Sequence, residues 1–139
     1  MIAIIDYGMG NLRSVSKALE SLGARCKLCT SGRSLATAKK IILPGVGAFG
    51  DAMKELKARG FIEPLRSSIA KGKKLLGLCL GLQLFFESSQ EGQPCCGLGL
   101  IKGKIKKFAP STGLKIPHIG WNQIIFSKDA CPLLEGVKE

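Results

Sequence analysis

The chain alternates short apolar runs with segments of helical spacing, and this alternation limits the folds open to it. The runs at 2–6, 40–43 and 74–78 are four or five residues long and mostly apolar, which is typical of buried strands in a parallel sheet. A further strand is predicted at 24–29, and the spacing of Leu12, Val15 and Leu19 predicts a helix. We therefore expect an α/β fold with a flavodoxin-like, doubly wound and mostly parallel sheet.

Boundary residues divide the rest of the chain into elements. Asn11 is a good N-cap for the first helix and Gly23 closes it. We expect further helices at 49–60, 62–69 and 80–89, a Gly/Pro-rich loop at 92–99, and strands at 100–108 and 122–126. Ligands of such folds bind where parallel strands end. That rule selects the turns after Asp6, Leu43 and Leu78.

Composition sets the class of protein. The 139 residues are enough for one domain, and 45% hydrophobic and 22% charged residues are ordinary for a soluble protein. The N-terminal MIAIIDYGMG has no basic region, so it is not a signal peptide and we expect a cytoplasmic location. The net charge is +11, but the basic residues are spread and only one Trp and one Tyr are present. A solvated basic surface is favoured over a nucleic-acid partner. No apolar run approaches the roughly 18 residues of a membrane span, so we expect no membrane association.

The six cysteines do not suggest a metal site. Cys26 and Cys29 form a C-x-x-C within a predicted strand, where side chains three residues apart point to opposite faces. Cys95 and Cys96 are adjacent in a predicted loop, which is also a poor ligand spacing. We predict reduced thiols, no metal and no cofactor.

A cysteine stands at the junction of a predicted strand and a predicted helix, in Gly77-Leu78-Cys79-Leu80-Gly81. A small residue two places to either side of a nucleophile is the nucleophile-elbow pattern, here with Cys in place of Ser. The turn is tight, and larger side chains at the flanking positions would clash. The turn also places Cys79 at a helix N-terminus, which stabilises a thiolate. The alternative is a structural Cys between two packing glycines.

A glycine-rich loop follows the third predicted strand, at 44–50. It contains G-x-G-x-x-G, but it does not open a first βαβ unit and no acid lies about 20 residues beyond Gly50, as a dinucleotide site requires. We favour a loop whose backbone N–H groups face an oxyanion. A loop that merely needs positive φ angles is the alternative.

Four segments together resemble the class I glutamine amidotransferases, and the resemblance covers nearly the whole chain. They are DYGMGNL at 6–12, LPGVGAFG at 43–50, GLCLGLQ at 77–83 and PHIGWN at 117–122. The resemblance implies that Cys79 attacks the side-chain amide of L-glutamine and forms a glutamyl thioester, which water hydrolyses to glutamate after ammonia leaves. The oxyanion would be held by backbone N–H groups of Val46 and Leu80, with Gly45 and Gly47 shaping the loop.

The resemblance also implies the remaining roles. Gln83 and Glu91 match positions that contact glutamine. Ammonia would pass through a channel to a (β/α)8-barrel cyclase that converts PRFAR to imidazole glycerol phosphate and AICAR in histidine biosynthesis. The positions that match the interface with this partner are Asn11, Pro117, His118 and Trp121.

One part of the family pattern is missing from these residues. The family completes its triad with a His and a Glu in an H-P-E segment, whereas the one histidine here is His118, in the PHIGWN element. We therefore expect residues 1–139 to be the N-terminal part of an amidotransferase domain and to be inactive alone. Two other classes stay open: an inactive copy or scaffold that only docks on the cyclase, and a flavodoxin-like Cys redox protein or hydrolase.

Overall fold

The computed structural model describes residues 1–108, 119–123, 125 and 132–137. The chain forms two compact units, Met1–Lys107 and Phe108–Glu139. The described residues of the second unit include one short 3₁₀ helix, η3 (Pro132–Leu134). The predicted strand at 122–126 does not form at the described residues 122, 123 and 125, and its other two residues lie outside the described part of the chain.

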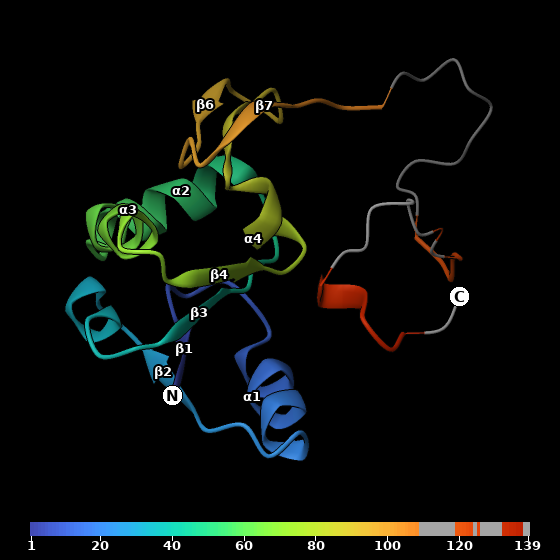
Figure 1. The fold of residues 1–139 in the computed structure, drawn as a ribbon. Helices are drawn as coiled ribbons and strands as arrows, with labels where there is room; N and C mark the ends of the chain where they lie inside the picture. Colours follow the sequence, from blue (N-terminus) through green and yellow to red (C-terminus); the bar gives the residue numbers. More distant parts are fainter. Residues whose placement is uncertain (109–118, 124, 126–131, 138–139) are drawn as a thin grey trace. The chain divides into compact units, whose positions relative to one another are not determined.

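Four parallel strands form the main sheet of the first unit, in the order β2-β1-β3-β4 (Figure 1). They are β1 (Ile2–Ile5), β2 (Cys26–Cys29), β3 (Lys40–Leu43) and β4 (Lys74–Gly77). The central strands β1 and β3 are buried at three of their four positions, as their apolar sequences require. The order reverses direction at β1, as in flavodoxin-like sheets. The predicted α/β fold is confirmed.

Helices connect these strands, and most begin and end where the sequence predicts. Helix α1 (Leu12–Ser21) joins β1 to β2, η1 (Gly32–Leu35) lies between β2 and β3, and α2 (Phe49–Ala58) and α3 (Ile62–Ala70) join β3 to β4. Asn11 is the N-cap of α1, because its side chain accepts a hydrogen bond from Ser14 N. Figure 1 shows α1 on one side of the sheet and α2 with α3 on the other.

Helix α2 lies at the carboxyl edge of the sheet. It starts six residues after β3 ends. Just beyond its other end, the Gly60 carbonyl oxygen packs against Gly32, which follows β2. A Cβ on Gly32 would overlap this oxygen. Both ends of α2 therefore meet segments that leave the carboxyl ends of strands, which is where this fold class binds ligands.

The predicted helix at 80–89 was wrong in length. Helix α4 covers only Leu80–Gln83, and the chain then enters β5 (Phe86–Ser89). β5 is the middle strand of a second, three-stranded sheet with β6 (Cys95–Cys96) and β7 (Ile101–Ile105), so part of the predicted loop at 92–99 is also a strand. Pairing with β6 and β7 satisfies the backbone of Phe86–Ser89 and overrides the local helical spacing.

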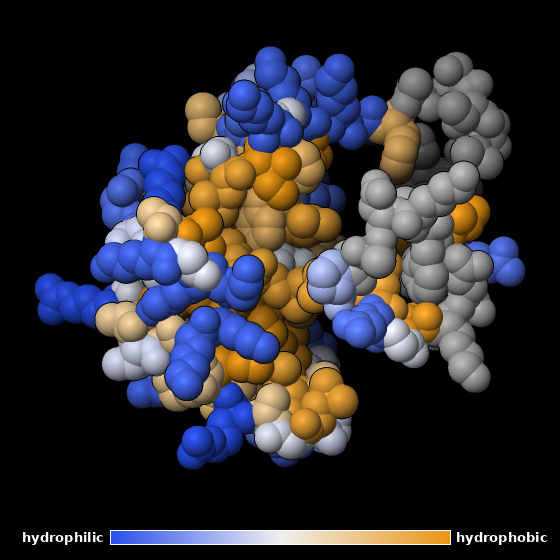
Figure 2. Space-filling view, viewed as in Figure 1, coloured by the Kyte–Doolittle hydropathy of each residue, from blue (hydrophilic) through white to orange (hydrophobic). Residues whose placement is uncertain are grey.

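The main buried cluster lies on one side of the sheet, whereas the other side has both buried and exposed apolar side chains. The largest fully buried side chains of the cluster include Tyr7, Phe49 and Phe61, on the side of α2 and α3. Helix α1 has no buried residue, and Leu76 of β4 and Leu82 of α4 are 40% and 47% exposed. Figure 2 shows apolar side chains gathered where Figure 1 draws β4 and α4.

Candidate active site

Cys79 occupies a strained turn between β4 and α4. Its φ of 54° and ψ of −117° place it in a region that L-residues rarely adopt, and it is the one non-glycine residue with positive φ among those described. The thiol is exposed. This conformation is the nucleophile elbow that the sequence predicts. A strained backbone at an exposed thiol suggests a functional constraint, because strain of this kind persists only where surrounding structure enforces it.

The two glycines that flank Cys79 are required by backbone contacts. A Cβ on Gly77 would lie 2.5 Å from Leu82 Cα and 2.6 Å from Leu82 N. A Cβ on Gly81 would overlap the carbonyl oxygen of Leu43 and lie 2.8 Å from its carbonyl carbon. The neighbours are main-chain atoms, which cannot rotate away as a side chain would. The predicted steric reason for the Gly-x-Cys-x-Gly pattern is confirmed.

Helix α4 is a single turn of four residues. It is shorter than the ten-residue helix predicted at 80–89. Leu80 is the first residue of α4, so its backbone N–H has no acceptor within the helix and is available to a ligand.

The glycine-rich loop lies directly against the elbow. Leu78 N donates to Leu43 O over 3.0 Å, which ties the end of β4 to the end of β3. A Cβ on Gly45 would lie 2.9 Å from Gly81 N and 3.0 Å from Leu80 Cβ. Val46 is 53% exposed, and Gly47 has a φ of +99°. The structure thus brings Gly45 against Leu80 and Gly81, and the oxyanion-binding role of this loop stays a prediction.

The two predicted glutamine-contacting residues contact different segments, Gln83 the elbow and Glu91 the start of α2. Gln83 is the last residue of α4, and its backbone N–H donates to Cys79 O over 3.3 Å. Glu91 follows β5, and its carboxylate accepts a hydrogen bond from Phe49 N over 3.0 Å, at the start of α2. An acid at a helix N-terminus satisfies a free N–H and interacts favourably with the dipole. Glu91 therefore also anchors the far end of the glycine-rich loop.

The sequence analysis did not single out Tyr7, which the structure places beneath this loop. Its side chain is fully buried, and its hydroxyl donates to Pro44 O over 3.0 Å. Burial raises the pKa of Tyr7 to about 12, because the charged phenolate is poorly solvated there. The two residues are 37 positions apart in sequence. The one sequence signal for this contact is that Tyr7 follows an apolar strand.

The predicted interface residues are only partly described. Asn11 lies at the carboxyl edge of the sheet, just after Gly10, which packs against Pro44. Trp121 is described and fully exposed. Pro117 and His118 lie outside the described residues. Their interface roles stay predictions.

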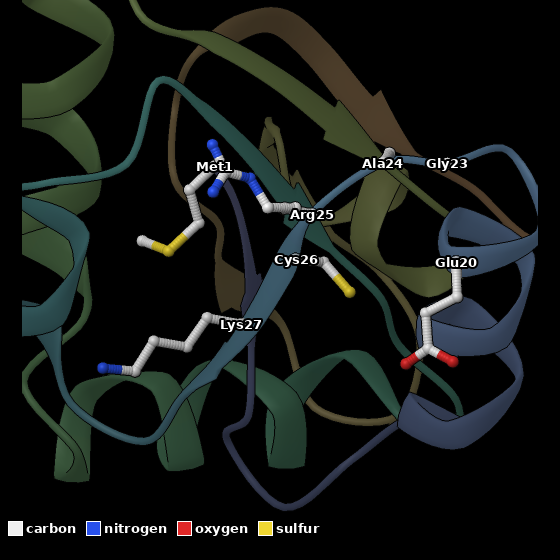
Figure 3. Close-up of a pocket in the computed structure, with 7 residues that line it drawn as sticks. All are labelled: Met1, Glu20, Gly23, Ala24, Arg25, Cys26 and Lys27. Atoms are coloured by element: carbon white, nitrogen blue, oxygen red, sulfur yellow. The ribbon is translucent and has the colours of Figure 1, made fainter.

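A pocket at the other edge of the main sheet does not extend this site. It is lined by Met1, Glu20 and residues 23–27, beside the starts of β1 and β2. Figure 3 shows the Glu20 side chain on one side and those of Arg25 and Lys27 extending to the other, so charged groups do not converge there.

Within the described part of the chain, no three His, Cys, Asp or Glu side chains are grouped to hold a metal. No helix among these residues is long and apolar enough to cross a membrane.

The parallel α/β sheet and the positive-φ turn at Cys79 are what the resemblance to class I glutamine amidotransferases predicts, and comparison with known proteins shows the family. Residues 3–139 match the family model described as glutamine amidotransferase class-I. A solved structure titled a crystal structure of glutamine amidotransferase superimposes with a TM-score of 0.68 at 22% identity, covering 84% of this chain and 60% of that one. The chain belongs to the class I glutamine amidotransferase family.

Within that family, the chain is similar to proteins named imidazole glycerol phosphate synthase subunit HisH. It is 54% identical over 125 residues to the one from Nostoc punctiforme, covering 89% of this chain and 58% of that protein. It is 50% identical over 143 residues to the one from Shouchella clausii, covering all of this chain and 69% of that protein. The chain thus spans 58% and 69% of the lengths of these two relatives.

Proposed function

We propose that the chain is the glutaminase part of a HisH-type subunit of imidazole glycerol phosphate synthase. The observation that carries the proposal is Cys79, an exposed thiol on a positive-φ turn against the glycine-rich loop. The proposal is supported by the comparisons, because 54% and 50% of the aligned residues are identical to those of two HisH proteins over most of the chain. A cysteine with a purely structural role would not require a strained backbone or two glycines beside it.

In the proposed reaction, the Cys79 thiolate attacks the side-chain carbonyl carbon of glutamine. The oxyanion is held by the N–H groups of Leu80 and of the loop at Val46, with Gly45 and Gly47 allowing the loop its path. The C–N bond breaks, ammonia leaves with a proton from a general acid, and a thioester forms. Water then hydrolyses the thioester to glutamate and returns the thiol. Gln83 and Glu91 hold the substrate.

A general base completes this chemistry in the family. The 139 residues contain no His-Pro-Glu segment, so we propose that this base comes from outside them. Loss of one triad member lowers the rate by several orders of magnitude, on the order of 10⁴-fold. The chain by itself is therefore expected to bind glutamine and react once with electrophilic analogues, and not to turn over.

The test is alkylation of Cys79 by a chloroketone analogue of glutamine, followed by mass spectrometry. Glutamine should protect Cys79, and Cys79→Ser should abolish the labelling. Cys96 is also exposed and serves as an internal control, because its labelling should be indifferent to glutamine. Equal labelling of both cysteines with and without glutamine would favour the redox or hydrolase alternative and overturn the proposal.

The second part of the proposal concerns the partner. We infer a heterodimer with a (β/α)8-barrel cyclase in the cytoplasm, with ammonia passing through a channel to the lyase reaction that forms imidazole glycerol phosphate. Asn11, Pro117, His118 and Trp121 would face this partner. The exposed Trp121 suits an interface anchor, and Trp121→Ala should weaken the complex roughly tenfold or more. Wild-type affinity in that variant would remove Trp121 from the interface, and binding without any glutamine-dependent labelling would favour the docking-only scaffold.

A further inference from the structure

The buried hydroxyl of Tyr7 reaches the glycine-rich loop at its first peptide. Tyr7 is the single tyrosine of the chain. It is 0% exposed, and its Oη lies 3.0 Å from Pro44 O. A buried tyrosine needs some hydrogen-bond acceptor, and here that acceptor is the carbonyl that opens the loop.

Peptide planarity converts this bond into control of the next N–H. The Pro44 carbonyl and the Gly45 N–H belong to one planar unit in which they point in opposite directions. Fixing the carbonyl therefore fixes the direction of the N–H. Gly45 has little room to compensate, because a Cβ there would lie 2.7 Å from Tyr7 Oη and 2.9 Å from Gly81 N.

The other end of the loop is fixed as well, by a contact of a different kind. Glu91 accepts from Phe49 N over 3.0 Å. Between the two anchors lie Val46, Gly47 and Ala48, which are all exposed. The anchors thus hold the ends of a loop whose middle peptides are free to face a ligand at Cys79.

We propose that Tyr7 is a positioning residue for the proposed glutaminase reaction: its hydroxyl orients the loop from Gly45 to Gly47 so that backbone N–H groups face the oxyanion formed at Cys79. The inference rests on the proposed function and assigns the hydroxyl a role beyond filling the core. Burial raises the pKa of Tyr7 to about 12, so the phenol remains a hydrogen-bond donor well above neutral pH.

The test compares two reagents that react with the same thiol. With a chloroketone analogue of glutamine, the thiolate first adds to the ketone carbonyl and gives a thiohemiketal oxyanion; chloride is then displaced as the thioether forms. Iodoacetamide loses iodide by direct displacement at its methylene carbon, and no tetrahedral oxyanion forms. Tyr7→Phe keeps the ring and removes only the hydroxyl. It should lower the rate of chloroketone labelling of Cys79 on the order of tenfold, less than the 10²–10³ of a lost oxyanion donor. Iodoacetamide labelling should change less than about twofold, since the thiol itself is untouched.

The matched control is Leu35→Val, a conservative change at a buried residue of η1, outside the loop and elbow. It should leave the ratio of the two rates unchanged. An unchanged ratio in Tyr7→Phe, or an equal fall with both reagents, would overturn the positioning role. Failure of glutamine to protect wild-type Cys79 would instead refute the proposed function, and the inference with it.

Labelling of buried Cys29, which is 1% exposed, reports whether each variant is folded. If Tyr7→Phe unfolds the chain, 3-fluorotyrosine can replace the single tyrosine with little change in volume. Fluorine lowers the pKa of the phenol, so the alkaline pH at which the ratio falls should move downward. A profile that does not move would contradict the inference.

Discussion

Replacing Gly81 by Ala tests whether steric fit at the elbow holds β3 and β4 together. The new Cβ would overlap the Leu43 carbonyl oxygen and lie 2.8 Å from the carbonyl carbon. That oxygen also accepts from Leu78 N over 3.0 Å. The methyl group can fit only if the main chain of β3 and the elbow separate, which breaks this hydrogen bond.

The expected loss follows from those two effects. Forcing extra volume into a packed site costs about 1–3 kcal/mol, and a lost hydrogen bond adds about 1 kcal/mol. We expect Gly81→Ala to lower the free energy of unfolding by roughly 2–4 kcal/mol, a large part of the 5–15 kcal/mol typical of a domain. The control is Gly50→Ala in α2, where a Cβ meets nothing within 4 Å. That change should stabilise the helix by up to about 1 kcal/mol.

Urea unfolding followed by far-UV circular dichroism measures both variants. With a slope of about 1–3 kcal/mol per molar urea, the two midpoints should differ by roughly 2 M. Cys79 labelling by iodoacetamide in the absence of urea shows whether the elbow itself has opened. A Gly81→Ala midpoint within about 0.3 M of wild type, at an unchanged slope, would refute the steric account of the elbow.

Three further changes test other features of the structure. Burial raises the pKa of Tyr7 from 10.0 to about 12. The resulting contribution to the free energy of unfolding is complete below pH 10 and is lost as pH rises toward 12. This loss, on the order of 2–3 kcal/mol, should be absent in Tyr7→Phe when urea midpoints are compared at pH 9 and 11.5. Asn11→Ala removes the hydrogen bond from Ser14 N and should lower the free energy of unfolding by about 1 kcal/mol, while Asn11→Asp should lower it little. The thermal midpoint of Asn11→Ala should therefore be below that of Asn11→Asp. Equal midpoints would show that the cap does not stabilise the chain. Cys79→Gly should raise the unfolding free energy by about 1 kcal/mol through relief of the positive-φ strain, whereas Cys79→Ala should not.

Local sequence patterns predicted the main sheet because its strands are apolar, short and bounded by turn residues. The elbow was equally predictable, since only glycine fits beside Leu82 and Leu43 backbone atoms. The helix at 80–89 was overestimated because Leu84 and Phe85 continue an apolar face whether the chain is helical or extended. Both are buried in the structure, but the following residues pair with β6 and β7, and spacing alone does not reveal such partners.

Contacts between distant residues were the other gap. The hydrogen bonds from Tyr7 to Pro44 and from Phe49 to Glu91 join positions 37 and 42 apart. Each depends on the path of the chain after a strand, which no local pattern encodes. The family resemblance supplied roles for Glu91 and Gln83, but it did not indicate that the Glu91 carboxylate holds the first turn of α2.

The position of β1 in the sheet bears on how the chain folds as it leaves the ribosome. β1 is synthesised before both of its partners, because Ile2 pairs with Cys26 on one side and Lys40 on the other. The first strand therefore has no partner until most of the first forty residues have emerged. Parallel pairing between such separated segments is slow, because the intervening chain loses loop-closure entropy before any stabilising contact forms. During this interval the apolar segment of β1 is a target for chaperones and for self-association.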